Sequence, residues 1–313
     1  MNTNYTISNL MKTIIMSLLA VLLTSAVYSQ NEPMYSQYMF NMMAANPAYA
    51  GSRGAIGLNY FGRAQWSGIA GAPTTNSVSL DGATLDGRFG FGVQLYNDKI
   101  GVYSDNVANF SFSTRVKVSD NGVLSGGLSL GIKNSRIDYT NVKNVYDLND
   151  YKFQQNVSRW DPTLGAGVMY NTDKFYLGVS IPNILSSANV YTNGAKTNDY
   201  HLFVASGYVF DITDDIKLKP STLLKMSSGA PTELDFNANV WLHNTVGVGA
   251  SYRTGDAYVG MAEVQLSRQL RLGYAYDITT SALKTIAGST NEVMFRYEFA
   301  GKESKNVKST RYF

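Results

Sequence analysis

The chain has 313 residues, of which 44% are hydrophobic, and a formal net charge of +3. It contains no cysteine, which excludes disulfides, thiolate metal sites and cysteine nucleophiles. The excess of positive charge lies after Ala300, so the rest of the chain is nearly neutral and we expect no nucleic-acid partner. The 22 tyrosines are unusually many, and tyrosine suits the boundary between lipid and water.

The N-terminus has the features of a secretory signal. Lys12 precedes an apolar run at residues 14–23, and small residues follow up to Ser29. We therefore predict a signal peptide over residues 1–29, cleaved near Ser29, with Met11 as an alternative start. The apolar run is too short to span a bilayer as a helix, and no later stretch reaches that length, so no transmembrane helix is expected.

Residues 30–54 lack the strict alternation of a strand. The spacing of five apolar residues fits one face of a short helix: Tyr35, Tyr38, Met39, Met42 and Met43. Asn46-Pro47 would end that helix. We predict that this segment is a plug, packed in the periplasmic mouth or the lumen of the barrel described next. The alternative is a first strand followed by a loop.

From residue 55 to residue 299, apolar residues alternate with polar residues or glycine. In one such segment, Leu234, Phe236 and Ala238 alternate with Asp235 and Asn237. Strand side chains point alternately to two faces, so many such segments behind a secretory signal predict an all-β protein, a transmembrane antiparallel β-barrel. We expect about fourteen strands, near residues 55–66, 75–84, 88–98, 107–118, 123–137, 163–171, 174–182, 200–211, 215–226, 232–243, 245–254, 257–267, 269–278 and 291–299.

Tight turns such as Asn121-Gly122 join many of these segments, whereas residues 99–106, 138–162, 183–199 and 279–290 are predicted to be longer loops. A soluble β-sandwich array is the competing fold. It is disfavoured because linkers that would divide the chain into units of about 100 residues are absent. Alternating glycines, such as Gly165 and Gly167, also favour a curved wall with internal space.

Charged and polar residues fall on the inward set of the strands, and a charge facing lipid would cost about 2–4 kcal/mol. The predicted lumen residues are Arg63, Asp81, Arg88, Asp235, Asn237, Arg253, Arg271, Asp277, Glu292 and Arg296. Because both signs are present, we expect a salt-bridged, partly filled lumen rather than an ion-selective pore.

Signals of catalysis are weak. Gly127, Ser129 and Gly131 have the spacing of a hydrolase nucleophile elbow, but the alternation continues through them, whereas an elbow needs a strand-to-helix turn. The two histidines stand apart, so we expect no metal site, no cofactor and no enzyme activity.

Several strings, spread in order over the whole mature chain, resemble the PorP/SprF family of outer-membrane proteins associated with type IX secretion and gliding motility. The residues that carry the resemblance include Tyr35, Ser36, Gln37, Tyr38, Asn46, Pro47, Gly51, Gln65, Trp66, Asp161 and Pro162. The resemblance implies a non-enzymatic outer-membrane barrel that supports export or surface anchoring of large adhesins bearing a type IX C-terminal domain. It also implies contact with periplasmic ring or lipoprotein components, either as a core component or as an accessory dedicated to one adhesin.

Two further segments are candidates for partner contact. The loops over 138–162 and 183–199 carry aromatic residues suited to an external surface partner: Tyr146, Tyr151, Phe153 and Tyr191. The basic tail, residues 300–313, is predicted to dock on a periplasmic protein, to act as an assembly signal, or to have no role. The competing functions are an outer-membrane diffusion channel for a small hydrophobic or polar substrate and a barrel hydrolase.

Overall fold

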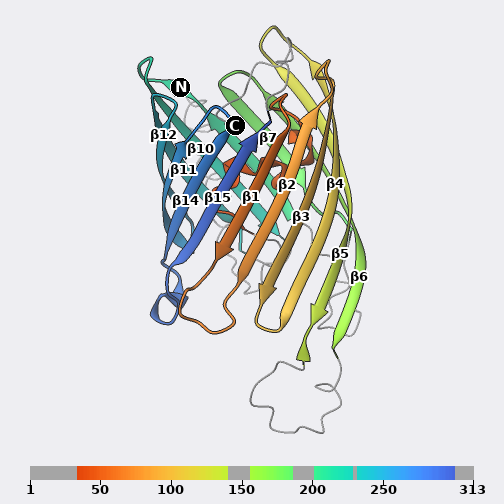
Figure 1. Cartoon of the computed structure of the whole chain (residues 1–313), viewed down its shortest axis with the longest axis vertical. Helices are drawn as coiled ribbons and strands as arrows, with labels where there is room; N and C mark the ends of the chain where they lie inside the picture. Colours follow the sequence, from red (N-terminus) through yellow and green to blue (C-terminus); the bar gives the residue numbers. More distant parts are fainter. Residues whose placement is uncertain (1–33, 140–155, 186–200, 228–230, 300–313) are drawn as a thin grey trace, which may run out of the picture.

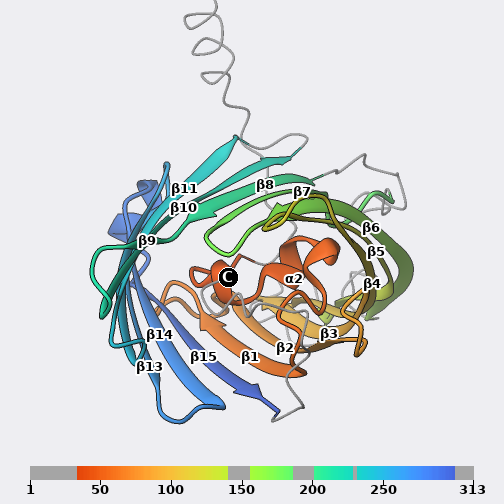
Figure 2. The same ribbon diagram turned by 90° about the horizontal axis from the view of Figure 1, so that it is seen from above.

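The computed structural model describes residues 34–139, 156–185, 201–227 and 231–299. Antiparallel strands close into one barrel around the N-terminal segment (Figures 1 and 2). The strands are β1 (Gly57–Ala64), β2 (Thr74–Ala83), β3 (Phe89–Ile100), β4 (Tyr103–Lys117), β5 (Val123–Ile137), β6 (Val157–Asn171), β7 (Phe175–Ile181), β8 (His201–Tyr208), β9 (Phe210–Asp211), β10 (Ile216–Ser227), β11 (Glu233–Leu242), β12 (Val246–Arg253), β13 (Ala257–Gln265), β14 (Leu270–Thr279) and β15 (Thr290–Glu298).

The sheet is closed because β1 pairs with β15 as well as with β2, and β10 pairs with β11. Both β8 and β9 pair with β10, and only Val209 separates them, so they form one interrupted strand. The wall therefore has fourteen strands, and the predicted antiparallel barrel of about fourteen strands is confirmed. No helix among the described residues is long and apolar enough to cross a membrane.

Alternation along each strand separates the two faces of the wall. In β11, Phe236 points outward and is 48% exposed, whereas Asn237 points inward and is 5% exposed. The outer face is thus apolar and open to its surroundings, and the inner face is polar and covered. This distribution is the one that a lipid-facing barrel requires.

The two rims of the barrel differ. At the rim where β1 begins, strands are joined by short turns such as 84–88, 118–122 and 172–174. At the opposite rim lie the connection 65–73, the connection 280–289, which holds the short helix η6 (Ala282–Thr285), and the connections that include residues 140–155 and 186–200. We call these the tight-turn rim and the long-loop rim. In outer-membrane barrels short turns face the periplasm and longer loops face outside.

Two predicted loops are wrong. Residues 99–106 form the end of β3, a two-residue turn and the start of β4, with Gly101 at φ +58° in the turn. Likewise β6 begins at Val157, so Asp161 and Pro162 belong to a strand. The strands β4, β5 and β6 each have 15 residues and are the longest of the described wall (Figure 1). Near the long-loop rim polar residues occur on both faces of β4 and β6, such as Asp105 and Asn106 or Ser158 and Arg159, so apolar–polar alternation does not mark these ends as strand.

Pro162 lies on an edge of β6 that suits it. β7 pairs with β6 from Ala166 onward, and the next contact along that edge is the amide of Ile184 with the carbonyl of Leu164. Alternate residues share an edge, so Pro162 faces the same side as Leu164, beyond the last β7 contact. Proline has no amide hydrogen to donate there, so an edge without a strand partner in the described residues tolerates it.

Candidate functional site

The N-terminal segment fills the lumen, which confirms the predicted plug (Figure 2). The plug, residues 35–51, folds as η1 (Tyr38–Phe40), α2 (Met42–Ala45) and η2 (Pro47–Tyr49). The predicted single helix is wrong. Asn41 and Asn46 interrupt it, and Asn46 is extended because a proline follows. The Asn46 side chain then accepts the amide hydrogen of Ala48 at 2.9 Å and so begins η2.

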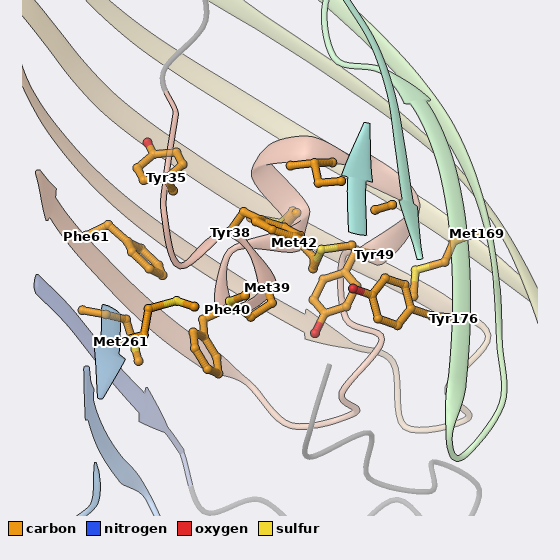
Figure 3. Packing of buried hydrophobic residues seen from close by; sticks show 14 of the residues in the cluster. Tyr35, Tyr38, Met39, Phe40, Met42, Tyr49, Phe61, Met169, Tyr176 and Met261 are labelled. Carbon is orange, nitrogen blue, oxygen red and sulfur yellow. The ribbon is translucent and has the colours of Figure 1, made fainter. Parts of the chain in front are cut away.

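Apolar side chains of the plug form one cluster with the inner wall (Figure 3). Met39 and Met42 are almost completely buried, and the Tyr35 ring packs edge-on against Phe61 of β1 at 5.5 Å between centroids. Such burial is worth about 25 cal/mol per Å² of apolar surface. The plug is therefore a packed part of the barrel interior.

An ionic anchor holds the first residues of the plug near the long-loop rim. Glu292 of β15 accepts the backbone amides of Ser36 and Gln37, each at 2.8 Å. Arg63 of β1 pairs with Glu292 at 3.0 Å and with Asp277 of β14 at 2.8 Å. The Ser36 hydroxyl donates to Asp277 and accepts from Arg63 at 2.7 Å. All these charges are buried, and each has an opposite charge and hydrogen bonds, as buried ions require.

A second ionic group continues from this anchor along the wall. Arg253 of β12 is 1% exposed and lies 2.9 Å from Asp235 of β11 and 3.1 Å from Asp256. It also lies 3.7 Å from Asp277, and Lys225 of β10 lies 3.7 Å from Asp235. The two groups are thus linked into one network through Asp277.

The middle of the plug makes polar contacts with the same half of the wall. The Tyr38 hydroxyl lies 3.4 Å from Ser221 and accepts a hydrogen bond from Asn237 at 3.1 Å. Burial raises the pKa of Tyr38 above its ordinary value, so this hydroxyl stays neutral. The Arg271 guanidinium lies 5.9 Å from the centre of the Phe40 ring.

The end of the plug is fixed near the tight-turn rim. The Ala50 carbonyl accepts from the Ser113 hydroxyl at 2.8 Å and from Arg115, both on β4. The Gly51 amide donates to Asp81 of β2 at 2.9 Å. Gly51 has φ +65°, and a Cβ there would lie 2.3 Å from the Gly82 carbonyl oxygen, so this position requires glycine.

Glycines in the opposite half of the wall admit the plug backbone and side chains. A Cβ at Gly127 of β5 would lie 2.2 Å from the Ala48 amide nitrogen, and one at Gly167 of β6 would lie 2.2 Å from the Asn46 side-chain oxygen. A Cβ at Gly92 of β3 would lie 2.1 Å from the Met43 sulfur. The sequence suggested that alternating glycines leave internal space. The plug occupies that space, which sequence spacing alone does not reveal.

The structure places nine of the ten predicted lumen residues on the inner face. Eight belong to the contacts above or are buried nearby, and Arg296 pairs with Glu298 at 2.6 Å. Arg88 is a correction: it lies in the turn before β3, with its side chain 77% exposed, because parity does not extend into a turn. Sequence reasoning missed Lys219 of β10, which is 0% exposed and lies 5.4 Å from the centre of the Tyr176 ring.

The residues that carried the family resemblance occupy three places. Those from Tyr35 to Gly51 belong to the plug, and Gln65 and Trp66 lie in the connection after β1, where Trp66 has φ +48°. Asp161 of β6 is paired with Arg159 at 2.9 Å. The candidate partner residues Tyr146, Tyr151, Phe153 and Tyr191 lie outside the described residues, as do the predicted signal peptide and tail.

The described residues leave a small cavity in the lumen. A cavity of about 60 Å³ remains beside the plug, lined by Tyr35, Asn109 and Lys133 among others. Ser129 lines it from the middle of β5, whose pairing with β4 and β6 continues unbroken, so the strand-to-helix turn of a nucleophile elbow does not occur there. Among the described residues, no group of three or more His, Cys, Asp or Glu side chains could hold a metal.

Comparison with solved structures gives outer-membrane barrels at low similarity. The toluene transporter TbuX of Ralstonia pickettii matches at TM-score 0.49 and 10% identity, over 88% of this chain and 97% of that one. Omp33 of Acinetobacter baumannii matches at TM-score 0.47 and 9% identity, over 79% of this chain and 100% of that one. A FadL homologue of Pseudomonas aeruginosa matches at TM-score 0.45 and 11% identity, over 88% and 100%.

No curated protein matches the sequence. A family model does, over residues 27–297, and it describes the type IX secretion system membrane protein PorP/SprF. The matched region contains the plug and almost every residue of the wall. The chain therefore belongs to the PorP/SprF family of type IX secretion system membrane proteins.

Proposed function

We propose that this protein is a non-enzymatic outer-membrane component or accessory of the type IX secretion system, which supports the export or surface anchoring of large cell-surface adhesins. The observation that carries the proposal is the closed lumen: the plug is bonded to the wall at both ends and packed along its middle. A barrel closed in this way contributes surfaces to an assembly rather than a conduit through it.

The surface partner is an adhesin bearing a type IX C-terminal domain, and it contacts the long-loop rim. Supporting this, β5 and β6, the stems of one of the long connections, project beyond β4 at that rim (Figure 1). Periplasmic ring or lipoprotein components contact the tight-turn rim, where the basic tail, residues 300–313, is a candidate docking segment.

Affinity isolation from gently solubilised outer membranes tests the proposal. We expect a large surface protein, a periplasmic ring component or both to accompany the barrel. A variant with serine at Tyr146, Tyr151, Phe153 and Tyr191 should lose the surface partner. The matched control, Leu85→Ser, changes a side chain that is 89% exposed at the tight-turn rim and should retain it. Isolation of the barrel without any secretion component or surface protein would contradict the proposal.

The competing function, a diffusion channel for a small hydrophobic or polar substrate, predicts a different electrical behaviour. We expect the wild-type barrel to be nearly silent in a planar bilayer, because residues 35–51 occupy the lumen. Steady conductance by the wild type, with no increase after a substitution that loosens the plug, would favour the channel.

A further inference from the structure

The outer face of β2, β3, β4 and β5 carries a row of four asparagines in one register line. Asn76 is the register partner of Asn97, Asn97 of Asn106, and Asn106 of Asn134. We call these four residues the asparagine row. Asn97 donates to the Asn106 side-chain oxygen at 2.9 Å, and Asn134 donates to the Ser158 hydroxyl at 2.9 Å. Each amide has two donor hydrogens and two acceptor sites, so the row retains hydrogen-bonding capacity toward its surroundings.

The next line toward the membrane centre is apolar and hollowed. Its register partners are Val78, Leu95, Ala108 and Ile132, two residues along each strand from the asparagine row. The three larger side chains are exposed, at 42–51%, and the small Ala108 lies between them. A hollow of about 420 Å³ results, lined by Asn76, Asn97 and Asn106 of the asparagine row on the side toward the long-loop rim, with Trp160 of β6 at its end.

The next line toward the long-loop rim carries two cations. It consists of Thr74, Lys99, Ser104, Arg136 and Ser158 in register. Lys99 and Arg136 are both exposed and lie two strands apart, about 10 Å between backbones at a strand spacing of ~4.8 Å. Arg136 has an acidic neighbour, Asp138 at 4.0 Å, but its side chain is still 50% exposed.

The opposite half of the barrel lacks this arrangement at the same rim. Its outward residues near the long-loop rim include four tyrosines, exposed at 40–57%: Tyr252, Tyr258, Tyr274 and Tyr276. Tyrosines are the ordinary residues of a barrel girdle at the lipid boundary. On β2 to β5 asparagines and the cations Lys99 and Arg136 stand beside an apolar hollow in place of such tyrosines. This face therefore differs from an ordinary girdle at the boundary between lipid and water.

We propose that the outer face of β2–β6 binds a phosphorylated amphiphile from the membrane leaflet next to the long loops. Its acyl chain occupies the hollow over Ala108, hydroxyl or amide groups of its headgroup bond to the asparagine row, and phosphate contacts Lys99 and Arg136. From the membrane centre toward the long-loop rim, the face presents an apolar hollow, then side-chain amides, then cations. Such a lipid presents its acyl chain, its hydroxyl or amide groups and its phosphate in the same order. The inference is independent of the proposed role in secretion.

The test uses the full barrel in detergent micelles, titrated with lipid A, a diphosphorylated acylated disaccharide, and followed by native mass spectrometry. Dephosphorylated lipid A is the second probe. We expect the phosphorylated form to bind at least tenfold more tightly to wild type at low salt, and this preference to shrink at high salt. The variant Lys99→Gln/Arg136→Gln should lose the preference. The control Arg88→Gln/Lys117→Gln, which removes two exposed cations from the opposite rim, should keep it.

Ala108→Phe provides an independent check of the hollow. It should weaken both lipid forms alike, because it fills the space assigned to the acyl chain. All variants should keep heat-modifiable gel migration, since the changed side chains lie on the outer face. Equal binding of the two lipid forms to wild type, or the same affinities in the two double variants, would overturn the proposal. So would a protein partner that crosslinks from position 106 in place of lipid.

Discussion

The ionic anchor allows a quantitative test of how the wall and the plug are coupled. Replacing Arg63 with Met removes its pairs with Asp277 and Glu292 and its bond to the Ser36 hydroxyl. Removing one partner of a buried ion pair costs about 3–5 kcal/mol, because the remaining charge stays buried without compensation. We expect Arg63→Met to lower the free energy of unfolding by an amount in this range.

A double substitution separates charge imbalance from lost contacts. Arg63→Met/Glu292→Met removes one charge of each sign, and Asp277 keeps Arg253 at 3.7 Å. We therefore expect the double variant to lose less unfolding free energy than the sum of the two single losses, by about 1–3 kcal/mol, the upper part of the range of about 0.5–3 kcal/mol for residues in contact. Urea unfolding of the barrel in lipid vesicles measures this. A loss of unfolding free energy in the double variant that equals the sum of the two single losses to within about 0.5 kcal/mol would refute the coupled network.

Plug occupancy provides a second measurement on the same variants. Glu292 accepts the amides of both Ser36 and Gln37, so every variant that lacks it should loosen the start of the plug, whatever its stability. The chain has no cysteine, so Met34→Cys is a single labelling site next to this anchor. We expect faster maleimide labelling in the Glu292 variants than in wild type. Unchanged labelling would show that Glu292 does not hold the plug.

The other predictions concern packing at named positions. Gly167→Val should displace the plug and raise conductance, because even a Cβ there would lie 2.2 Å from the Asn46 side chain. Gly126→Ala is the control and should leave conductance unchanged, since a Cβ there has nothing within 4 Å. Equal conductance of the two variants would refute the close fit at Gly167. Phe236→Arg should block membrane assembly, at a cost of about 2–4 kcal/mol on the lipid face, as heat-modifiable gel migration measures. Assembly of Phe236→Arg at wild-type level would place that residue away from lipid. Asn237→Arg should assemble but expel the plug, because Asn237 bonds directly to Tyr38. Faster maleimide labelling of Met34→Cys in this variant would show the release.

The fate of Asn237 shows where sequence reasoning reaches its limit. Alternation along β11 places this residue inward, and the structure agrees: Asn237 is 5% exposed and bonds to Tyr38 of the plug. Alternation encodes which face a side chain occupies, because it depends only on neighbours in the strand. Which plug residue meets Asn237 depends on a contact between residues about 200 positions apart in the chain, which no local pattern records.

Strand ends show a related limit. Alternation requires one polar and one apolar face, so the parts of β4 and β6 beyond the lipid belt, where Asn, Ser and Asp face both sides, resembled loops. Arg88 was predicted to face inward by counting alternate residues back from β3, but it lies in the turn before that strand, where alternation does not hold. Fold class, approximate strand number and the plug were predictable because each depends on composition and period. The glycine contacts were not, since alternation places both Gly127 and Gly131 inward, yet of these two only Gly127 meets the plug.

The plug is held by two different kinds of contact, and this difference predicts how it can be released. On the β1 and β11–β15 side the contacts are ionic and polar, so changing one charge weakens them. On the β3–β7 side hydrogen bonds such as that from Ser113 to the Ala50 carbonyl are joined by close contacts at Gly127 and Gly167. A larger side chain at either glycine pushes the plug out rather than removing an attraction. Either change alone leaves the contacts on the other side intact, so each single variant should release the plug only in part. Arg63→Met combined with Gly167→Val should therefore raise bilayer conductance by more than the product of the two single effects. A purely multiplicative response would mean that the two sides hold separate parts of the segment and that the plug does not leave as one unit.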